Sequence, residues 1–299
     1  MAVVNTNIAA SIAQAALAKN ERALGTAMEQ LSTGKKINSA SDNAAGLAIS
    51  TRMTSQIRGL DQAIRNAHDA QSMISTAEGA LDEITAMLQR IRELALQSGT
   101  GTTDAADRSY LNEEFGHLLS EIDRIAENTQ WNGRDILDGT AGGASSGVAF
   151  QVGADPSQTI SLTFGNFTDA NSGAVVGVMA SLATSAVGGA GGGIFTLSAA
   201  TIASAIQNAS MVITAADKAM DAVSTQRAAF GAVTNRLVHA VDNLTNVMTN
   251  AEVTRSRILD TDYAASTSEL ARTQIIQQAG TAMLAQANEL PSTVLSLLQ

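Results

Sequence analysis

Cysteine is absent from this chain of 299 residues, and aromatic residues make up only 3% of it. Without cysteine, disulfides and thiolate chemistry are excluded. With few aromatic side chains, any core must be packed by Ala, Leu, Ile, Val and Met, and small side chains suit close helix–helix contact. The chain is nevertheless long enough for one large domain or two modest ones.

Basic residues are also scarce. There are 18 Lys and Arg against 28 Asp and Glu, and the formal net charge is −10. This balance argues against nucleic acid as a partner, because phosphates need a basic face, and it argues weakly against anionic membrane surfaces. No apolar run is long enough to span a bilayer. We therefore expect neither nucleic acid nor a membrane as a partner.

The N-terminal segment lacks the pattern of a cleaved secretory signal. Its first basic residue is Lys19, and Asn5, Asn7, Ser11 and Gln14 interrupt any apolar stretch. The sequence alone predicts a cytosolic protein, unless the chain is exported without a cleaved signal.

Motifs for catalysis and metal binding are missing. The three histidines, His68, His117 and His239, are far apart in the sequence, so each is interpreted as a polar helix residue rather than a metal ligand. Glu113 and Glu114 are adjacent carboxylates, which on a helix are expected to be solvated charges. No Gly-x-Ser-x-Gly elbow occurs. We expect no catalytic, cofactor or metal site, and the chain is not predicted to be an enzyme.

Composition changes sharply twice along the chain. No Lys or Arg occurs between Arg134 and Lys218, and roughly half of the glycines lie between Gly139 and Gly193. The Gly-rich run 188–193 has no lysine and follows no predicted strand, so it is interpreted as a linker and not as a phosphate-binding loop. The flanks are charged and periodic, which predicts helix-rich ends around a Gly/Ser/Thr-rich middle.

Apolar spacing predicts the helices. The first is expected over about 8–31 with a stop at Thr33–Gly34, followed by a long helix to about 98 that Ser39–Asp42 could cap. A further helix should follow a cap at Thr103–Asp104, and the last helical stretch, 201–290, should contain a break. The long helix carries a heptad seam with one slip between Ala67 and Ala77. The seam residues are Ile74, Ala77, Leu81, Ile84, Leu88, Ile91 and Ala95.

The middle of the chain contains one hairpin signal. Apolar residues alternate around 148–152 and again around 160–164, and Gly153–Thr159 separates the two runs as a loop. Trp131–Gly133 marks a turn.

Both ends of the chain are uncharged and amphipathic. The first eighteen residues carry no charged side chain, and residues 279–299 carry only Glu289. These ends could pack on the chain's own core, or they could associate with other copies. Because the middle separates two helical halves, the halves most simply pair as an antiparallel rod, which has little surface left to cover apolar ends.

The predicted fold is therefore mainly α: a long antiparallel coiled-coil rod built from the N- and C-terminal segments, with a small β-hairpin region. Identical surfaces that do not close on themselves would produce a filament. The apolar residues expected to form the polymerisation core are Ile8, Ile12, Leu24, Leu31, Leu284, Leu290, Val294, Leu295, Leu297 and Leu298.

Motifs in both flanks support a family resemblance. Residues 31–49 read LSTGKKINSASDNAAGLAI, and residues 88–98 read LQRIRELALQS. Near the other end, residues 256–263 read SRILDTDY and residues 277–288 read QQAGTAMLAQAN. These motifs occur in this order over about two thirds of the chain, and they closely resemble the terminal signatures of bacterial flagellins.

The resemblance implies a subunit that stacks into a helical tube outside the cell for swimming motility. Residues 1–43 and 255–299 would form the inner tube, and 44–200 with 201–254 a surrounding rod with the hairpin at about 140–176. The Gly-rich connection 177–200 is too short for outer domains, which implies a minimal flagellin. The unfolded chain would leave through the flagellar export apparatus. Filaments of the family switch between two subunit packings in order to supercoil, and the heptad slip and the hairpin are hypothetical sites of that change.

The resemblance also implies partners: other copies of the chain, an export chaperone at the C-terminus, and filament cap and junction proteins. In many flagellins an innate immune receptor of animals binds the helix that bears Gln-Arg-x-Arg-Glu-Leu. The matching positions are Gln89, Arg90, Leu94 and Gln97, with Glu114 on the adjacent helix. Enterobacterial relatives have a basic residue where this chain has Leu118. The alternative is that these residues make axial contacts between subunits; both roles are compatible if polymerisation buries the surface.

Three alternative functions are less favoured by the sequence. A junction protein between hook and filament has related ends, but nearly continuous matches in both flanks favour the filament subunit. An adhesin-like coiled-coil binding module would not need two complementary termini. An enzyme embedded in the middle would need motifs that are missing.

Overall fold

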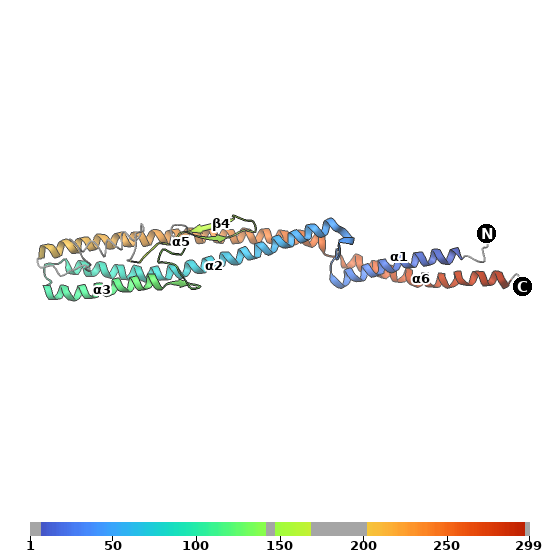
Figure 1. Ribbon diagram of the computed structural model, residues 1–299, viewed down its shortest axis with the longest axis horizontal. Coiled ribbons are helices and arrows are strands. Elements are labelled where there is room, and N and C mark those ends of the chain that lie inside the picture. Colours follow the sequence, from blue (N-terminus) through green and yellow to red (C-terminus); the bar gives the residue numbers. More distant parts are fainter. Residues whose placement is uncertain (1–6, 142–146, 169–201, 297–299) are drawn as a thin grey trace. The chain divides into compact units, whose positions relative to one another are not determined.

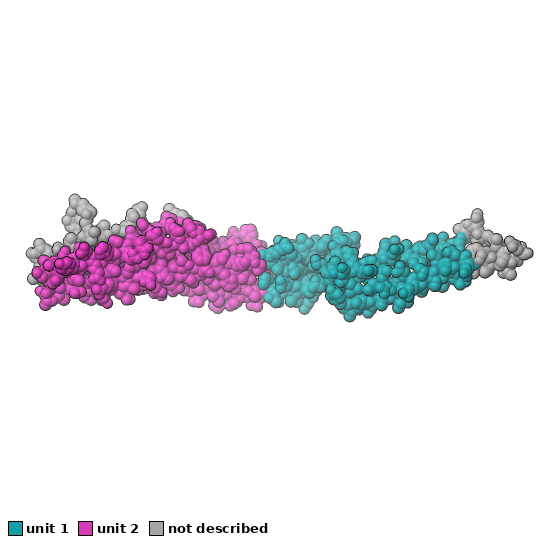
Figure 2. All heavy atoms as spheres, turned by 90° about the horizontal axis from the view of Figure 1, so that it is seen from below, with its two compact units in different colours: residues 1–58, 247–299 teal, residues 59–246 magenta. Residues whose placement is uncertain are grey.

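The structure is a computed structural model that describes residues 7–141, 147–168 and 202–296, apart from the side chains of 202–205 and 290–296. The chain forms two compact units, one of residues 1–58 with 247–299 and one of residues 59–246 (Figure 2). The predicted 177–200 connection lies outside the described residues. The predicted domain boundaries were 43/44 and 254/255, whereas the boundaries of the compact units fall at 58/59 and 246/247, inside two long helices.

The first unit contains helices α1 (Ile8–Thr33) and α6 (Tyr263–Ser296), which pack against each other (Figure 1). Asn7 caps α1 by accepting a hydrogen bond from the Ala10 N–H. Gly34 ends it in the left-handed conformation, at φ 70°, and donates its N–H to the Gln30 carbonyl. The predicted helix stop and the predicted pairing of the two ends are confirmed.

The connection after α1 differs from the expected capping. Helix α2 (Ala40–Ser98) has an extended residue inside its first turns, Asn43, whose side chain accepts the Gly46 N–H at 2.8 Å. Asn43 therefore caps the long helix. Asp42 accepts the Asn38 and Ser39 N–H groups at 3.0 and 2.9 Å instead, so its carboxylate holds the preceding turn and is not available to cap the long helix.

Backbone hydrogen bonds link two connecting segments, the one between α1 and α2 and the one between α5 (Ile202–Leu259) and α6. The Lys36 N–H donates to the Leu259 carbonyl at 2.7 Å, and the Thr261 N–H donates to the Gly34 carbonyl at 3.0 Å. The break predicted in the last helical stretch lies here, at residues 260–262.

The second unit is built around the apolar seam of α2. Leu81, Ile84, Leu88 and Ile91 are fully buried, which confirms the heptad pattern. Helix α3 (Ala105–Asn128) and the first part of α5 lie beside α2 and complete the core (Figure 1). A capping box at Asp104 begins α3, as the sequence predicted.

Two small antiparallel hairpins complete this unit. Strands β3 (Val148–Gln151) and β4 (Thr159–Leu162) form an antiparallel hairpin where the sequence predicts one, and Ile160 and Leu162 of β4 are buried. Strands β1 (Gln130–Trp131) and β2 (Arg134–Asp135) flank a turn whose residues Asn132 and Gly133 have positive φ. Both features agree with the predicted hairpin and turn.

Candidate assembly surface on the terminal helices

Two asparagine side chains connect α1 to α6. Asn20 is buried and donates from Nδ2 to the Thr273 carbonyl at 2.7 Å. Asn7 donates from Nδ2 to the Ala287 carbonyl, also at 2.7 Å. A polar side chain inside an apolar seam favours one register over its alternatives. The two bonds therefore specify how far α1 is displaced along α6.

A glycine allows the two helices to approach closely. A Cβ atom added to Gly280 would lie 3.2 Å from Cγ of Leu17, which is tighter than ordinary van der Waals contact. Glycine inside a helix costs about 0.5–1 kcal/mol relative to alanine. The close approach of Leu17 explains the glycine at this position, because a larger residue would crowd the Leu17 side chain.

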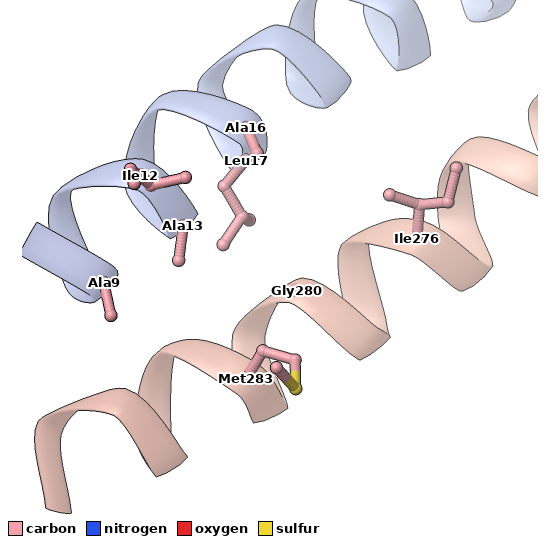
Figure 3. Close-up of a pocket in the computed structure, with 8 residues that line it drawn as sticks. All are labelled: Ala9, Ile12, Ala13, Ala16, Leu17, Ile276, Gly280 and Met283. Carbon is pink, nitrogen blue, oxygen red and sulfur yellow. The ribbon is translucent and has the colours of Figure 1, made fainter. Parts of the chain in front are cut away.

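Beside Gly280 lies an apolar hollow of about 420 Å³ between the two helices (Figure 3). Leu17 and Ala13 point from α1 toward α6. The hollow is lined only by apolar side chains and glycine: Ala9, Ile12, Ala13, Ala16, Leu17, Ile276, Gly280 and Met283. A two-helix pair cannot cover both faces of each helix, so the hollow and its rim remain open.

Large apolar side chains of both terminal helices are exposed, and three of them, Ile12, Ile276 and Met283, line this hollow. We call this the terminal surface, and define it by Ile8 and Ile12 of α1 and Ile275, Ile276 and Met283 of α6. Their exposed fractions range from 47% for Ile276 to 66% for Ile275 and Met283. No charged residue occurs in 8–18 or in 273–288. Apolar patches of this kind mark interaction sites in soluble proteins.

The structure separates the residues predicted for the polymerisation core into groups. Ile8 and Ile12 are exposed on the terminal surface. Leu24, Leu31 and Leu284 are half-buried. Leu290, Val294 and Leu295 belong to α6, but their side chains are outside the described residues, and so are Leu297 and Leu298.

The residues predicted to contact a receptor or a neighbouring subunit lie on the second unit. Arg90 donates from Nε to Glu114 at 2.8 Å and from Nη1 to Glu93 at 3.0 Å. The hydrogen bond that Arg90 donates to Glu114, followed by the one that it donates to Glu93, raises the pKa of Arg90 above its usual value. An ion pair thus connects α2 to α3 on the exposed surface.

The remaining members of that set divide between surface and core. Gln89 and Gln97 are exposed, and Glu114 is half-buried. Leu94 is fully buried in the core, so it supports the helix and presents no side chain to a partner. Leu118 packs partly buried against the same core. The residues of the set that a partner could contact are therefore the exposed Gln89, Arg90 and Gln97, with the half-buried Glu114 beside Arg90.

Sequence reasoning missed three features. The Asn20–Thr273 bond joins residues 253 positions apart, and no local pattern signals it. Neither the role of Gly280 nor the Arg90–Glu114 pair follows from spacing along one helix. The burial of Leu94 did have a signal, because Leu94 lies three residues after Ile91 of the heptad seam.

In the described residues, no group of three or more His, Asp or Glu side chains could hold a metal ion. In the same parts of the chain, no helix has both the length and the apolar character needed to cross a bilayer.

Comparison with known proteins gives consistent matches over the whole chain. Residues 4–142 match the family model described as bacterial flagellin N-terminal helical region, and residues 213–298 match the bacterial flagellin C-terminal helical region. The chain is 42% identical to a flagellin of Halalkalibacterium halodurans, over 99% of this chain and 100% of that one.

Two further comparisons concern the length of a relative and the similarity of the fold. The chain is 36% identical to flagellin A of Vibrio cholerae over 99% of both chains; the alignment spans 375 positions, so that relative contains segments that this chain lacks. A solved Vibrio parahaemolyticus structure, described as that of a flagellar hook-associated protein, has a TM-score of 0.59 at 15% identity and covers 73% of this chain and 100% of its own. At that identity the likeness concerns the fold alone.

Proposed function

Because this chain belongs to the bacterial flagellin family and is a structural subunit of the extracellular flagellar filament, we propose that its copies polymerise through the terminal surface. The observation that carries this proposal is the exposure of Ile8, Ile12, Ile275, Ile276 and Met283 on helix segments, 8–18 and 273–288, that contain no charged residue. The family's structural role agrees with the missing catalytic motifs, and the chain is not an enzyme.

The terminal surface can supply a large part of the association free energy. Full burial of one large apolar side chain is worth about 1.5–3 kcal/mol, and several such side chains are about half exposed or more. Their combined burial offsets a substantial part of the cost of immobilising a subunit. Because no charge lies within this surface, the contact should depend weakly on salt concentration.

We assign the parts of the filament as follows. Residues 1–43 with 255–299 form the inner tube, and residues 44–254 form the surrounding rod, with the hairpin near its outside. The lengths of the relatives support a minimal flagellin, since the H. halodurans chain aligns over 297 positions without large insertions, unlike the V. cholerae chain.

Three further partners are proposed from family membership. An export chaperone would bind the C-terminal residues, where Val294, Leu295, Leu297 and Leu298 provide an apolar segment. A filament cap and junction proteins would contact the polymer at its two ends. The chain would travel to them unfolded through the flagellar export apparatus.

An animal innate immune receptor is the fourth proposed partner. The proposal is supported by the exposed surface formed by Gln89, Arg90, Gln97 and Glu114, in which an ion pair already orients the guanidinium. The same surface is proposed as an axial contact between subunits, so that the receptor would bind the monomer and not the filament.

Neither alternative function is favoured. The relatives aligned over the full chain are flagellins at 36–42% identity, whereas the hook-associated likeness rests on 15% identity. No observation in the described residues supports an adhesin-like receptor surface.

Seeded elongation tests the assembly proposal. Purified monomer carrying Ile276→Asn is added to short filament seeds, and filament length is followed by electron microscopy. The matched control is Val238→Asn, a β-branched residue of α5 with 43% exposure against 47% for Ile276. We expect elongation to fall at least about tenfold for Ile276→Asn, because an asparagine must be buried, and to change little for the control. Equal elongation by both variants would contradict the proposal.

A further inference from the structure

Met283 is the most exposed methionine of the described part of the chain. Its exposed fraction is 66%, compared with 56% for Met28 and 5% for Met73. It lies on α6, three residues after Gly280, and lines the hollow together with Ile12, Leu17 and Ile276 (Figure 3). A reactive thioether is therefore accessible to solvent at the edge of the proposed contact surface.

Exposed thioethers are oxidised by peroxides. The peroxide O–O bond breaks, one oxygen atom bonds to sulfur, and the remaining fragment leaves as water or an alcohol; sulfur loses two electrons and the peroxide gains them. The product, a sulfoxide, is polar and accepts hydrogen bonds. Because accessibility governs the rate of such oxidation, Met283 should react ahead of buried methionines such as Met73.

The hollow offers a sulfoxide no hydrogen-bond donor from a side chain. Its lining consists of alanine, isoleucine, leucine, glycine and methionine only. In the free subunit, water satisfies the sulfoxide oxygen. Once the surface is covered by an apolar partner, that water is lost and the oxygen is left unpaired, which is unfavourable.

We propose that Met283 is an oxidation site that controls assembly: a peroxide converts its thioether to the sulfoxide, and a subunit that carries the sulfoxide is excluded from the growing filament. The inference rests on the proposed function, because the sulfoxide is harmful only if the terminal surface is buried on assembly. Subunits already in the filament would be protected, since their Met283 is covered.

The first experiment measures where oxidation occurs. Full-length monomer and assembled filament are treated with hydrogen peroxide, and sulfoxide at each methionine is quantified by peptide mass spectrometry. We expect Met283 to react about tenfold faster than Met73 in the monomer, and to be protected in the filament. Equal rates for Met283 and Met73 in the monomer, or equal rates for Met283 in monomer and filament, would overturn the inference.

The second experiment measures what oxidation does. Wild type, Met283→Leu and Met28→Leu are each compared with their own untreated sample in seeded elongation. Each variant removes one exposed thioether and keeps an apolar side chain of similar size. We expect peroxide to slow wild type and Met28→Leu about tenfold and to leave the treated-to-untreated ratio of Met283→Leu near one. A ratio for Met283→Leu as low as that of wild type would sink the inference.

The assembly surface and the role of Met283 are contradicted by different results. If untreated Ile276→Asn elongates as wild type does, the assembly surface itself is wrong. If Ile276→Asn is defective but peroxide has no effect on wild type, only the role of Met283 is wrong.

Discussion

The buried side-chain amide of Asn20 donates a hydrogen bond to the backbone carbonyl of Thr273 at 2.7 Å, across 253 positions of the sequence. Asn7 makes the equivalent contact to Ala287 nearer the ends of the helices. Between these two bonds Leu17 of α1 closely approaches Gly280 of α6, and apolar side chains of both helices line the hollow beside them. The polar contacts therefore specify register, and the apolar contacts supply most of the stabilisation.

Replacement of Asn20 should separate those two contributions. Asn20→Ala removes the bond and leaves a gap, and we expect it to destabilise the α1–α6 pair by about 1–2 kcal/mol. Asn20→Leu fills the gap with apolar volume, so stability should be largely retained while register specificity is lost. Hydrogen exchange of the α1 and α6 amides reports stability, and cross-linking between the helices reports register. If Asn20→Ala and Asn20→Leu gave the same hydrogen exchange and the same cross-links, the separate roles of polar and apolar contacts would be contradicted.

Alanine at Gly280 should behave unlike alanine at Gly25. Gly25 lies in α1 with nothing within 4 Å of an added Cβ, so Gly25→Ala should stabilise the pair by about 0.5–1 kcal/mol through helix propensity. At Gly280 the added Cβ would meet Leu17 at 3.2 Å, and the strain should cancel that gain or exceed it. Thermal unfolding followed by circular dichroism measures both, and a Gly280→Ala variant at least as stable as Gly25→Ala would refute the close approach.

Acid should loosen the connection between α1 and α2. Hydrogen bonds from the Ser39 and Asn38 N–H groups lower the pKa of Asp42 below its ordinary value. A carboxylate whose folded pKa is depressed stabilises the fold above its unfolded pKa, and this contribution is lost as pH falls from there through the folded pKa. Protection of the amides of residues 38–39, measured as their exchange relative to the intrinsic rate at each pH, should therefore fall below about pH 3.9.

The control for this effect is Asp42→Asn, which cannot ionise. Its amides at 38–39 should be less protected than those of the wild type at neutral pH, and their protection should not fall further through the same acidic window. A wild-type profile that matches that of Asp42→Asn at every pH would rule out the carboxylate as the cause.

The Arg90–Glu114 pair should matter for recognition and little for stability. Its side chains are 47% and 43% exposed, and solvent screens an exposed pair of this kind, so that it adds little to stability. We expect Arg90→Ala and Glu114→Ala to leave the midpoint of unfolding nearly unchanged and to weaken activation of a flagellin-responsive receptor by the monomer. Arg124→Ala is the matched control, because Arg124 forms an exposed ion pair with Glu121 within α3. Receptor activation unaffected by either change at the pair would remove this surface from the proposed site.

Most elements of the fold could be predicted from the sequence. The stop at Gly34, the cap at Asp104 and the heptad seam through Leu88 are local signals, and each appears in the structure where it was expected. The cap of α2 was misplaced, because Asp42 is committed to the Asn38 and Ser39 amides and Asn43 takes the capping position. Choosing between neighbouring capping residues requires knowing where the preceding turn goes.

The candidate site was predictable in kind but not in detail. Absence of charge near both termini predicts apolar terminal helices, and Ile8 and Ile12 are exposed there; that this surface mediates assembly stays a prediction. The hollow beside Gly280 was not predictable, because it depends on which residues of α6 face α1. Nothing in the spacing of either helix alone states that Leu17 meets Gly280.

The sequence by itself determined the helices, their ends and the apolar character of the termini, because 3–4 spacing, capping side chains and the distribution of charge act over a few residues. Only the tertiary structure decided the partners between helices, such as Asn20 of α1 with Thr273 of α6 and Arg90 of α2 with Glu114 of α3. These depend on register and on how three helices share one core, and both are set by contacts between segments far apart in the chain.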